Sequence, residues 1–339
     1  MNLSDVKQIG IVGGGPSTLM LCFEFAKLGI QTCILDPEVN CMGSAVASEH
    51  IIASINKENI KKLSLRCDKV IVNKKLDFEM DVKLHAPIYP TKEVLDEVCS
   101  LKNILDITEL LEIPTTKVYY QNNKEEAFEQ IDGLTLPFRF IKQYKGYSKQ
   151  LDVFSPDDLA DFILEVDEEA ESFILQPIEA YKQTISCICF ADTQGKVHLY
   201  HPIEVVYEED GTCHLAISDR ITKTMVNRLN RYNRKLMKEI NAVGAFTIRY
   251  GVKANKSVEF IDMTPELGVG SLLTLEAFDV PVFEQYARMV LEMKINAPEL
   301  LSYAHGTIRE TGEVEKNEVG KIYKIEQHKM CIRSEKMSE

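Results

Sequence analysis

Three consecutive glycines, from Gly13 to Gly15, stand between an apolar run and a helical pattern near the start of the chain. Glycine lets the backbone turn where a side chain would clash, and the free N–H groups at the start of the next helix can bind an anion. The spacing departs from the dinucleotide fingerprint Gly-x-Gly-x-x-Gly, because Thr18 replaces the third glycine. Asp36 stands near the place of a ribose-binding acid. The turn therefore predicts either a nucleotide or flavin site or a sheet entry that holds another ligand.

The elements around this turn form a β-α-β unit. The run Ile9–Val12 is apolar and β-branched, as in a buried parallel strand. The segment Ser17–Leu28 has apolar residues at helical spacing and ends before a glycine, and Gln31–Leu35 is a second apolar strand. Strand and helix patterns go on alternating as far as Val72, which predicts a doubly wound, mostly parallel α/β domain.

The composition limits the classes of function. A chain of 339 residues, 45% hydrophobic and 27% charged, is typical of a globular protein with two or three domains. The net charge of −13 argues against nucleic acid as a partner, because phosphate contacts need a basic surface. No apolar run reaches the length of a membrane span, and the start does not resemble a cleavable signal. The nine cysteines lack metal-ligand spacing and indicate reduced thiols, so we expect a cytoplasmic protein without a membrane partner.

Residues that could do chemistry recur in a definite order beyond the N-terminal unit. Lys102 stands on a predicted helix, Lys142 ends a predicted strand, and Phe173–Glu179 is a strand followed by a hinge with a proline. A long predicted helix over 219–242 comes next, and we interpret its arginines and lysines as a solvent face. A predicted strand that carries Asp262 follows this helix.

This order resembles the ATP-grasp family, and in particular its N5-carboxyaminoimidazole ribonucleotide synthases, the ATP-dependent carboxylases of purine synthesis. The resemblance extends to about Lys294, and three segments carry it: IGIVGGGPSTLMLCFEFAKLGIQTCILDPE, LKNILDITELLEIPTT and EFIDMTPELGVGSLLTLEAFDVPVFEQYARMVL. It implies an α/β ATP-grasp fold with a Rossmann-like parallel N-terminal domain over 1–90. A small lid subdomain over 91–178 and a large antiparallel-sheet subdomain with a C-terminal β extension over 179–339 would follow.

The resemblance also implies a ligase. ATP would phosphorylate bicarbonate to carboxyphosphate, and the amine of aminoimidazole ribonucleotide would take up the carboxyl group. Catalysis in such a site is mostly positioning and electrostatics, with lysines and Mg²⁺ neutralising the triphosphate. We therefore expect ATP and Mg²⁺ as cofactors, a phosphorylated small-molecule substrate, and the homodimer that the family implies.

The resemblance places each of these groups on residues of this chain. ATP is expected to contact Lys102, Lys142, Gln176, Pro177, Ile178 and Glu179. The phosphorylated substrate is expected to contact Gly14, Gly15, Pro16 and Arg249, and Mg²⁺ is expected at Asp262.

Some positions depart from the family pattern. Arg249 stands where the family has a metal-binding glutamate, Ile261 replaces an asparagine, and Glu266 replaces an arginine. A guanidinium in place of a carboxylate is enough to abolish a weak Mg²⁺ site, unless Arg249 itself meets phosphate oxygens with its fork of donors. A degenerate relative that binds nucleotide or a phosphorylated metabolite as a regulatory or partner subunit is therefore one alternative. The glycine turn alone leaves a flavin or nicotinamide oxidoreductase as another.

Overall fold

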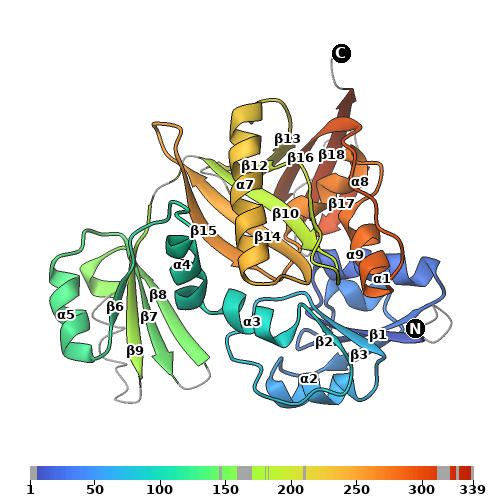
Figure 1. Cartoon of the computed structure of the whole chain (residues 1–339), viewed down its shortest axis with the longest axis horizontal. Coiled ribbons are helices and arrows are strands. Elements are labelled where there is room, and N and C mark those ends of the chain that lie inside the picture. Colours follow the sequence, from blue (N-terminus) through green and yellow to red (C-terminus); the bar gives the residue numbers. More distant parts are fainter. Residues whose placement is uncertain are drawn as a thin grey trace.

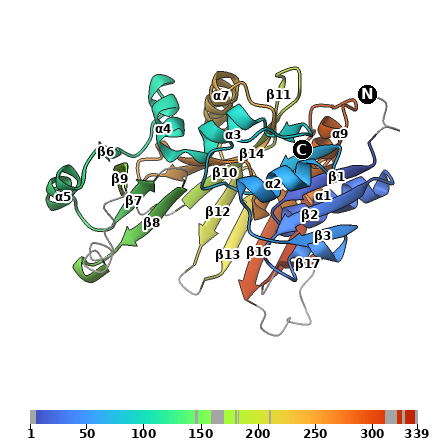
Figure 2. The same cartoon turned by 90° about the horizontal axis from the view of Figure 1, so that it is seen from below.

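The computed structural model describes residues 6–144, 147–158, 170–179, 181, 183–208, 211–310, 321–325 and 328–336. These residues form three β-sheets, which we name the N-terminal sheet (β3-β2-β1-β4-β5), the central sheet (β15-β14-β10-β12-β13-β16-β18-β17, with β11 beside β10) and the lid sheet (β6-β9-β7-β8). The lid sheet lies at one end of the molecule and the N-terminal sheet at the other, with the central sheet between them (Figures 1 and 2). Among the residues described, no helix combines the length and the apolar character that crossing a bilayer needs.

The N-terminal sheet is parallel throughout, as the sequence predicts. Its central strands β1 and β4 are almost wholly buried, because helices cover both faces and no solvent side remains for polar residues. The strands are β1 (Gln8–Val12), β2 (Gln31–Asp36), β3 (Glu49–Ile52), β4 (Lys69–Val72) and β5 (Ile88–Tyr89). The helices are α1 (Pro16–Lys27), α2 (Lys57–Ser64) and α3 (Lys92–Cys99).

The lid sheet is antiparallel and has a small core of its own. Phe138 and Phe140 pack there against Phe173 and Leu175, under the helix that carries Ala127. Its elements are β6 (Tyr119–Gln121), α5 (Lys124–Asp132), β7 (Phe138–Tyr144), β8 (Tyr147–Val153) and β9 (Ser172–Pro177). The connection to the N-terminal domain is α4 (Leu101–Leu110).

The central sheet is also antiparallel, which confirms the mixed α/β architecture. Its strands are β10 (Gln183–Ala191), β11 (Val197–Leu199), β12 (Ile203–Tyr207), β13 (Cys213–Ile217), β14 (Gly244–Val252), β15 (Val258–Thr264), β16 (Ser302–Glu310), β17 (Lys321–Ile325) and β18 (His328–Lys336). Its helices are α7 (Lys223–Glu239), α8 (Thr274–Ala277) and α9 (Val282–Val290). The long helix is shorter than predicted, because Thr222 caps its start by accepting the Met225 N–H.

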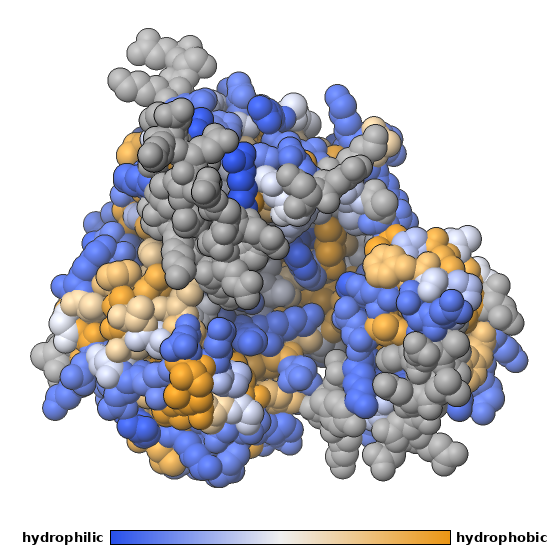
Figure 3. Space-filling model, turned by 180° about the vertical axis from the view of Figure 1, so that it is seen from behind, coloured by the Kyte–Doolittle hydropathy of each residue, from blue (hydrophilic) through white to orange (hydrophobic). Residues whose placement is uncertain are grey.

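Two cores hold the central sheet in place. On one face, Ile248 and Tyr250 of β14 pack with Leu229 and Leu236 of α7. The other core joins the central sheet to the N-terminal domain through the packing of α1 against α9. The described residues of the lid pack around a small core of their own, and a hollow separates the lid from the rest of the molecule when the surface is seen from behind (Figure 3).

Candidate functional site

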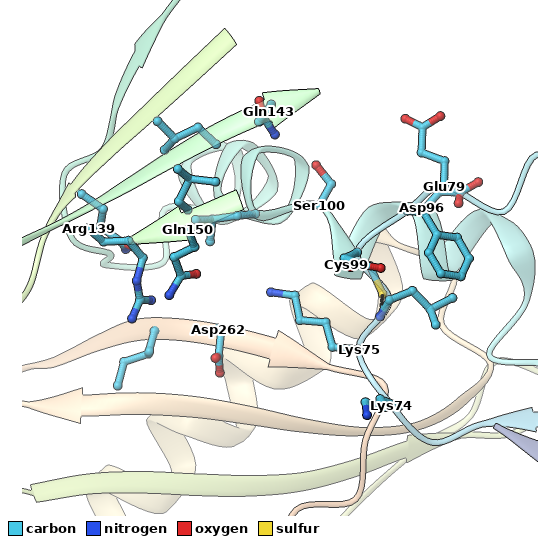
Figure 4. Close-up of a pocket in the computed structure, with 18 of the residues that line it drawn as sticks. Lys74, Lys75, Glu79, Asp96, Cys99, Ser100, Arg139, Gln143, Gln150 and Asp262 are labelled. Atoms are coloured by element: carbon cyan, nitrogen blue, oxygen red, sulfur yellow. Dashed lines mark hydrogen bonds between the residues drawn. The ribbon is translucent and has the colours of Figure 1, made fainter. Parts of the chain in front are cut away.

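A cavity of about 760 Å³ lies between the lid sheet and the central sheet. Strands β7 and β9 form its upper wall, β15 forms its floor, and the loop after β4 closes the end towards the N-terminal domain (Figure 4). The cavity therefore lies between the lid sheet, the central sheet and the loops of the N-terminal domain. We call it the cleft.

The alternation of β7 decides which of its residues reach the cleft. Arg139, Ile141 and Gln143 line it, whereas the side chains between them point to the opposite face, where Phe138 and Phe140 join the lid core. Lys142 lies between Ile141 and Gln143, so its side chain points to the face opposite the cleft, and it is 1% exposed. Lys142 is not among the residues that line the cleft, and its contact with ATP stays a prediction.

The second predicted lysine also stays outside the cleft. The sequence predicts a helix over Thr91–Leu101 that continues over Lys102–Ile113. In the structure, Ser100 ends α3 and caps α4 by accepting the Asn103 N–H at 3.3 Å. This break brings Ser100 and Leu101 to the cleft, while exposed Lys102 places its Nζ 5.6 Å from the ring centre of Tyr120. Neither lysine is among the residues that line the cleft, and their contacts with ATP stay predictions.

The predicted hinge does line the cleft, over Gln176, Pro177, Ile178 and Glu179. The Ile178 N–H donates to the Pro137 carbonyl at 3.0 Å, which anchors the hinge to the start of β7. Tyr181, which follows the hinge, donates its hydroxyl to Glu259 Oε2 at 3.0 Å. Burial raises the pKa of Tyr181 to about 12, so this hydroxyl stays protonated at neutral pH.

A β-bulge shapes the floor of the cleft. Arg249 pairs with Asp262 across β14 and β15, but the next residue, Tyr250, pairs with Phe260, so Ile261 has no partner in the ladder. A bulge turns two successive side chains to one side of a sheet, and both Ile261 and Asp262 line the cleft.

Asp262, the predicted metal ligand, is engaged by Arg249. Arg249 Nε donates to Oδ1 at 2.7 Å, and Nη2 donates to Oδ2. This hydrogen bonding, more than any other influence, raises the pKa of Arg249. Among the described residues, no group of three or more histidine, cysteine, aspartate or glutamate side chains could hold a metal ion. In nucleotide sites Mg²⁺ is held by one or two carboxylates together with substrate phosphates. Here both oxygens of the expected ligand Asp262 are engaged by Arg249, so this pair does not fit the Mg²⁺ that the resemblance implies.

The lid carries a second arginine–aspartate pair of the same form. Arg139 on β7 faces Asp152 on β8 across the ladder, with Nε–Oδ1 at 2.6 Å and Nη2–Oδ2 at 2.9 Å. The hydrogen bonds from Arg139 lower the pKa of Asp152. The pKa of Arg139 is raised chiefly by Asp152 and also responds to the charges of Asp262 and Arg249. The two pairs are therefore within electrostatic reach of each other.

Two lysines that the sequence analysis missed stand at the far end of the cleft. Lys74 and Lys75 follow β4, and Lys75 extends into the space between the lid and β15 (Figure 4). Glu266 lies within reach of both Lys74 and Arg249, whose charges oppose the rise in its pKa that burial causes. Ligands of parallel α/β domains bind at the carboxyl ends of the strands, so the position just after β4 was the signal available in the sequence.

The glycine turn lies beside this end, since a Cβ on Gly13 would stand 3.1 Å from Lys74 Cβ. The Gly14 N–H is occupied by Asp36 Oδ2 at 2.8 Å, and a Cβ on Gly14 would meet the side chain of Cys41 at 2.4 Å. Asp36 thus closes the turn from within, which removes its expected role as a ribose-binding acid.

Gly15 caps α1 and Pro16 is its first residue. A Cβ on Gly15 would meet no atom of the described residues within 4 Å, so this part of the turn is open to a ligand. A contact of Gly14, Gly15 or Pro16 with substrate stays a prediction.

Comparison with known families gives two adjacent matches. A model described as "Ribonucleotide synthetase preATP-grasp domain" matches residues 6–97, and one described as "ATP-grasp domain" matches residues 106–279, just over half of the chain.

Curated relatives are distant but extend over most of the chain. A phosphoribosylaminoimidazole carboxylase from Candida glabrata is 24% identical over 310 residues, 85% of this chain. The match spans only 52% of that protein, so the chain covers about half the length of this relative. An N5-carboxyaminoimidazole ribonucleotide synthase from Aquifex aeolicus is 22% identical over 303 residues, which cover 86% of this chain and 78% of that one.

Solved structures share the fold. The N5-carboxyaminoimidazole ribonucleotide synthetase from Thermus thermophilus has a TM-score of 0.76 at 17% identity, covering 96% of this chain and 93% of that one. A Staphylococcus aureus synthetase in complex with ADP has a TM-score of 0.73 at 19% identity, covering 88% and 81%. At these identities the likeness establishes the architecture.

Proposed function

Because this chain belongs to the ATP-grasp family, we propose that it is an ATP-dependent ligase that binds ATP in the cleft. The observation that carries the proposal is an apolar slot between two sheets. Ile141 and Ile174 line the cleft from the lid, and Ile261 lines it from β15. Such walls suit a planar purine, and Gln176 at the hinge offers amide donors and an acceptor to its edge.

The curated relatives point to a carboxylation as the reaction. The γ-phosphoryl group of ATP passes to an oxygen of bicarbonate, which yields ADP and carboxyphosphate. The amine of aminoimidazole ribonucleotide then attacks the carboxyl carbon, phosphate leaves, and the amine loses a proton. We assign Lys75, which extends into the cleft (Figure 4), to the transferred phosphoryl group, and the open side of Gly15 to the phosphate of the acceptor.

The test is ATP turnover by the purified chain with bicarbonate and aminoimidazole ribonucleotide. We expect ADP and phosphate release that requires all three substrates. Ile261→Arg fills the slot with a charged side chain and should abolish turnover, whereas Leu110→Arg on the exposed side of α4 should leave it unchanged, since Leu110 is 70% exposed. Absence of turnover at high enzyme concentration would refute the assignment to these substrates.

A second candidate function is nucleotide binding without turnover, as a regulatory or partner subunit. The ion pair between Arg249 and Asp262 favours it, because the pair engages the acid that a metal would need. Saturable ATP binding in a thermal-shift titration, together with no turnover of the three substrates, would support this candidate. The predicted homodimer is tested separately by light scattering of the purified chain.

A further inference from the structure

Two arginine–aspartate pairs, one on the lid sheet and one on the central sheet, are built in the same way, and one member of each pair, Arg139 and Asp262, lines the cleft. In each pair the arginine and the aspartate are direct partners across neighbouring antiparallel strands. In each pair Nε and Nη2 donate to the two carboxylate oxygens. One pair belongs to the lid, with Asp152, and the other to the floor, with Asp262.

This geometry leaves one edge of each guanidinium for a ligand. A guanidinium has five N–H donors, and the aspartate engages two of them, so three remain, including both on Nη1. The side chains of Arg249 and Arg139 are 51% and 33% exposed, so neither is sealed in the interior. The aspartate fixes the plane of each fork, and a fixed fork loses less entropy when it binds phosphate oxygens.

Lys75 supplies a third cation between the two walls. It lines the cleft and extends towards Gln150 and Asp262 (Figure 4). Of the other acids that line the cleft, Glu79 and Asp96 lie on the side away from Asp262 in the same view, and Asp77 and Glu179 line it as well. Arg139 and Lys75 therefore line the same cleft. Arg249 lies beside it, because it pairs with Asp262, which lines the cleft, and it is within electrostatic reach of Arg139.

We propose that Arg139, Arg249 and Lys75 bind the polyphosphate of a purine nucleoside di- or triphosphate without a divalent metal. The inference rests on the proposed binding of a nucleotide in the cleft, and it deepens that proposal by replacing Mg²⁺ with fixed arginine forks. Arg249 stands where a metal-binding carboxylate is expected and holds the remaining acid, Asp262. Mg²⁺ would have to displace Arg249 from Asp262, so the metal-free nucleotide is the preferred ligand.

The test measures ADP and ATP binding to the full chain by isothermal titration calorimetry, once in EDTA and once in excess Mg²⁺. We expect binding in EDTA, with a Kd that Mg²⁺ leaves unchanged or weakens. A Kd more than about tenfold lower in Mg²⁺ than in EDTA would overturn the inference.

Substitutions assign the effect to the arginine. Arg249→Gln is expected to weaken ADP binding in EDTA by about tenfold or more, because it removes a charged donor. Arg249→Lys keeps the charge but lacks the forked donors of a guanidinium, so its Kd for ADP should lie between those of the wild type and Arg249→Gln. Arg231→Gln is the matched control, since Arg231 is an exposed arginine on α7, which packs on the other face of the central sheet. Equal Kd values for Arg249→Gln and Arg231→Gln would refute the role of Arg249.

Arg249→Glu provides a gain-of-function test. It places a carboxylate opposite Asp262 and should create the Mg²⁺ dependence that the wild type lacks, with binding weakened in EDTA and restored by Mg²⁺. Thermal unfolding of each variant establishes that it is folded. If the wild type binds neither nucleotide under either condition, the proposed function fails along with the inference. If it binds only with Mg²⁺, the inference alone fails.

Discussion

Replacing Glu292 by glutamine is expected to weaken the junction between the N-terminal domain and the end of α9. Lys69 begins β4 and its side chain is 2% exposed. Its Nζ donates to the Val290 carbonyl at 2.6 Å and pairs with Glu292 Oε1 at 2.7 Å. Glutamine keeps the length of the side chain and an acceptor oxygen. The substitution therefore removes the charge and little else.

The size of the effect follows from the distance and the exposure of the two groups. Two unit charges at the 2.7 Å that separates Lys69 from Glu292 interact by about 6 kcal/mol at an effective dielectric constant of about 20 and by about 1.5 kcal/mol in water. Lys69 is buried, but the side chain of Glu292 is 47% exposed, so water screens one end of the pair. We expect Glu292→Gln to lower the free energy of unfolding by about 2 kcal/mol.

The measurement is urea unfolding followed by far-ultraviolet circular dichroism, because the chain has no tryptophan to report by fluorescence. Glu58→Gln is the matched control, since its ion pair with Lys62 spans 3.6 Å on the surface of α2 and should contribute less than about 0.5 kcal/mol. A change below about 0.5 kcal/mol for Glu292→Gln as well would refute the reasoning from burial.

The same pair has a pH signature. The hydrogen bond from Lys69 lowers the pKa of Glu292. A carboxylate whose folded pKa is depressed stabilises the native state above its unfolded pKa, and this stabilisation is lost as the pH falls towards the folded pKa. The difference between wild type and Glu292→Gln should therefore shrink below about pH 4.

Three further predictions concern the cleft and the lid. Gly251→Ala would place a Cβ 2.4 Å from ring atoms of Tyr181, so it should displace the chain after the hinge and weaken ATP binding by about tenfold or more in a thermal-shift titration. Lys75→Ala should weaken ADP binding at least about fivefold, and Lys102→Ala should change it less than about twofold, because Lys75 lines the cleft and Lys102 does not; equal effects would count against this placement. Asp152 has a lowered pKa, so the stability that it contributes to the lid should be lost as the pH falls below about 4, and Asp152→Asn should show a smaller loss over that range in hydrogen exchange of the lid.

The sequence predicts the N-terminal domain closely because its signals are local. The alternation of strands and helices is predicted to extend as far as Val72, and β4 ends at that residue. A buried parallel strand is marked by a short unbroken apolar run, and this mark does not depend on what the strand pairs with. The hinge could be placed for a similar reason, since Pro177 ends β9.

In the lid, local sequence signals do not determine which side chains reach the cleft. Both the predicted strand and the observed β7 contain Lys142, but a pattern of residues does not say which face of a strand will look into a cleft. That choice is made by pairing with β9, where Phe138 lies opposite Pro177. A shift of one residue would turn every side chain of β7 to the other face. The role expected for Lys142 depended on this choice.

The sequence by itself determined the parallel N-terminal domain and the residues of the hinge, because apolar periodicity and turn residues act over a few neighbours. Only the tertiary structure decided which charges meet. Arg249 and Asp262 stand opposite each other because a bulge at Ile261 sets the register of β14 and β15. Lys75 joins them through a loop that belongs to another domain. Electrostatic energy depends on distances in space, and those are fixed by register and by the packing of the sheets.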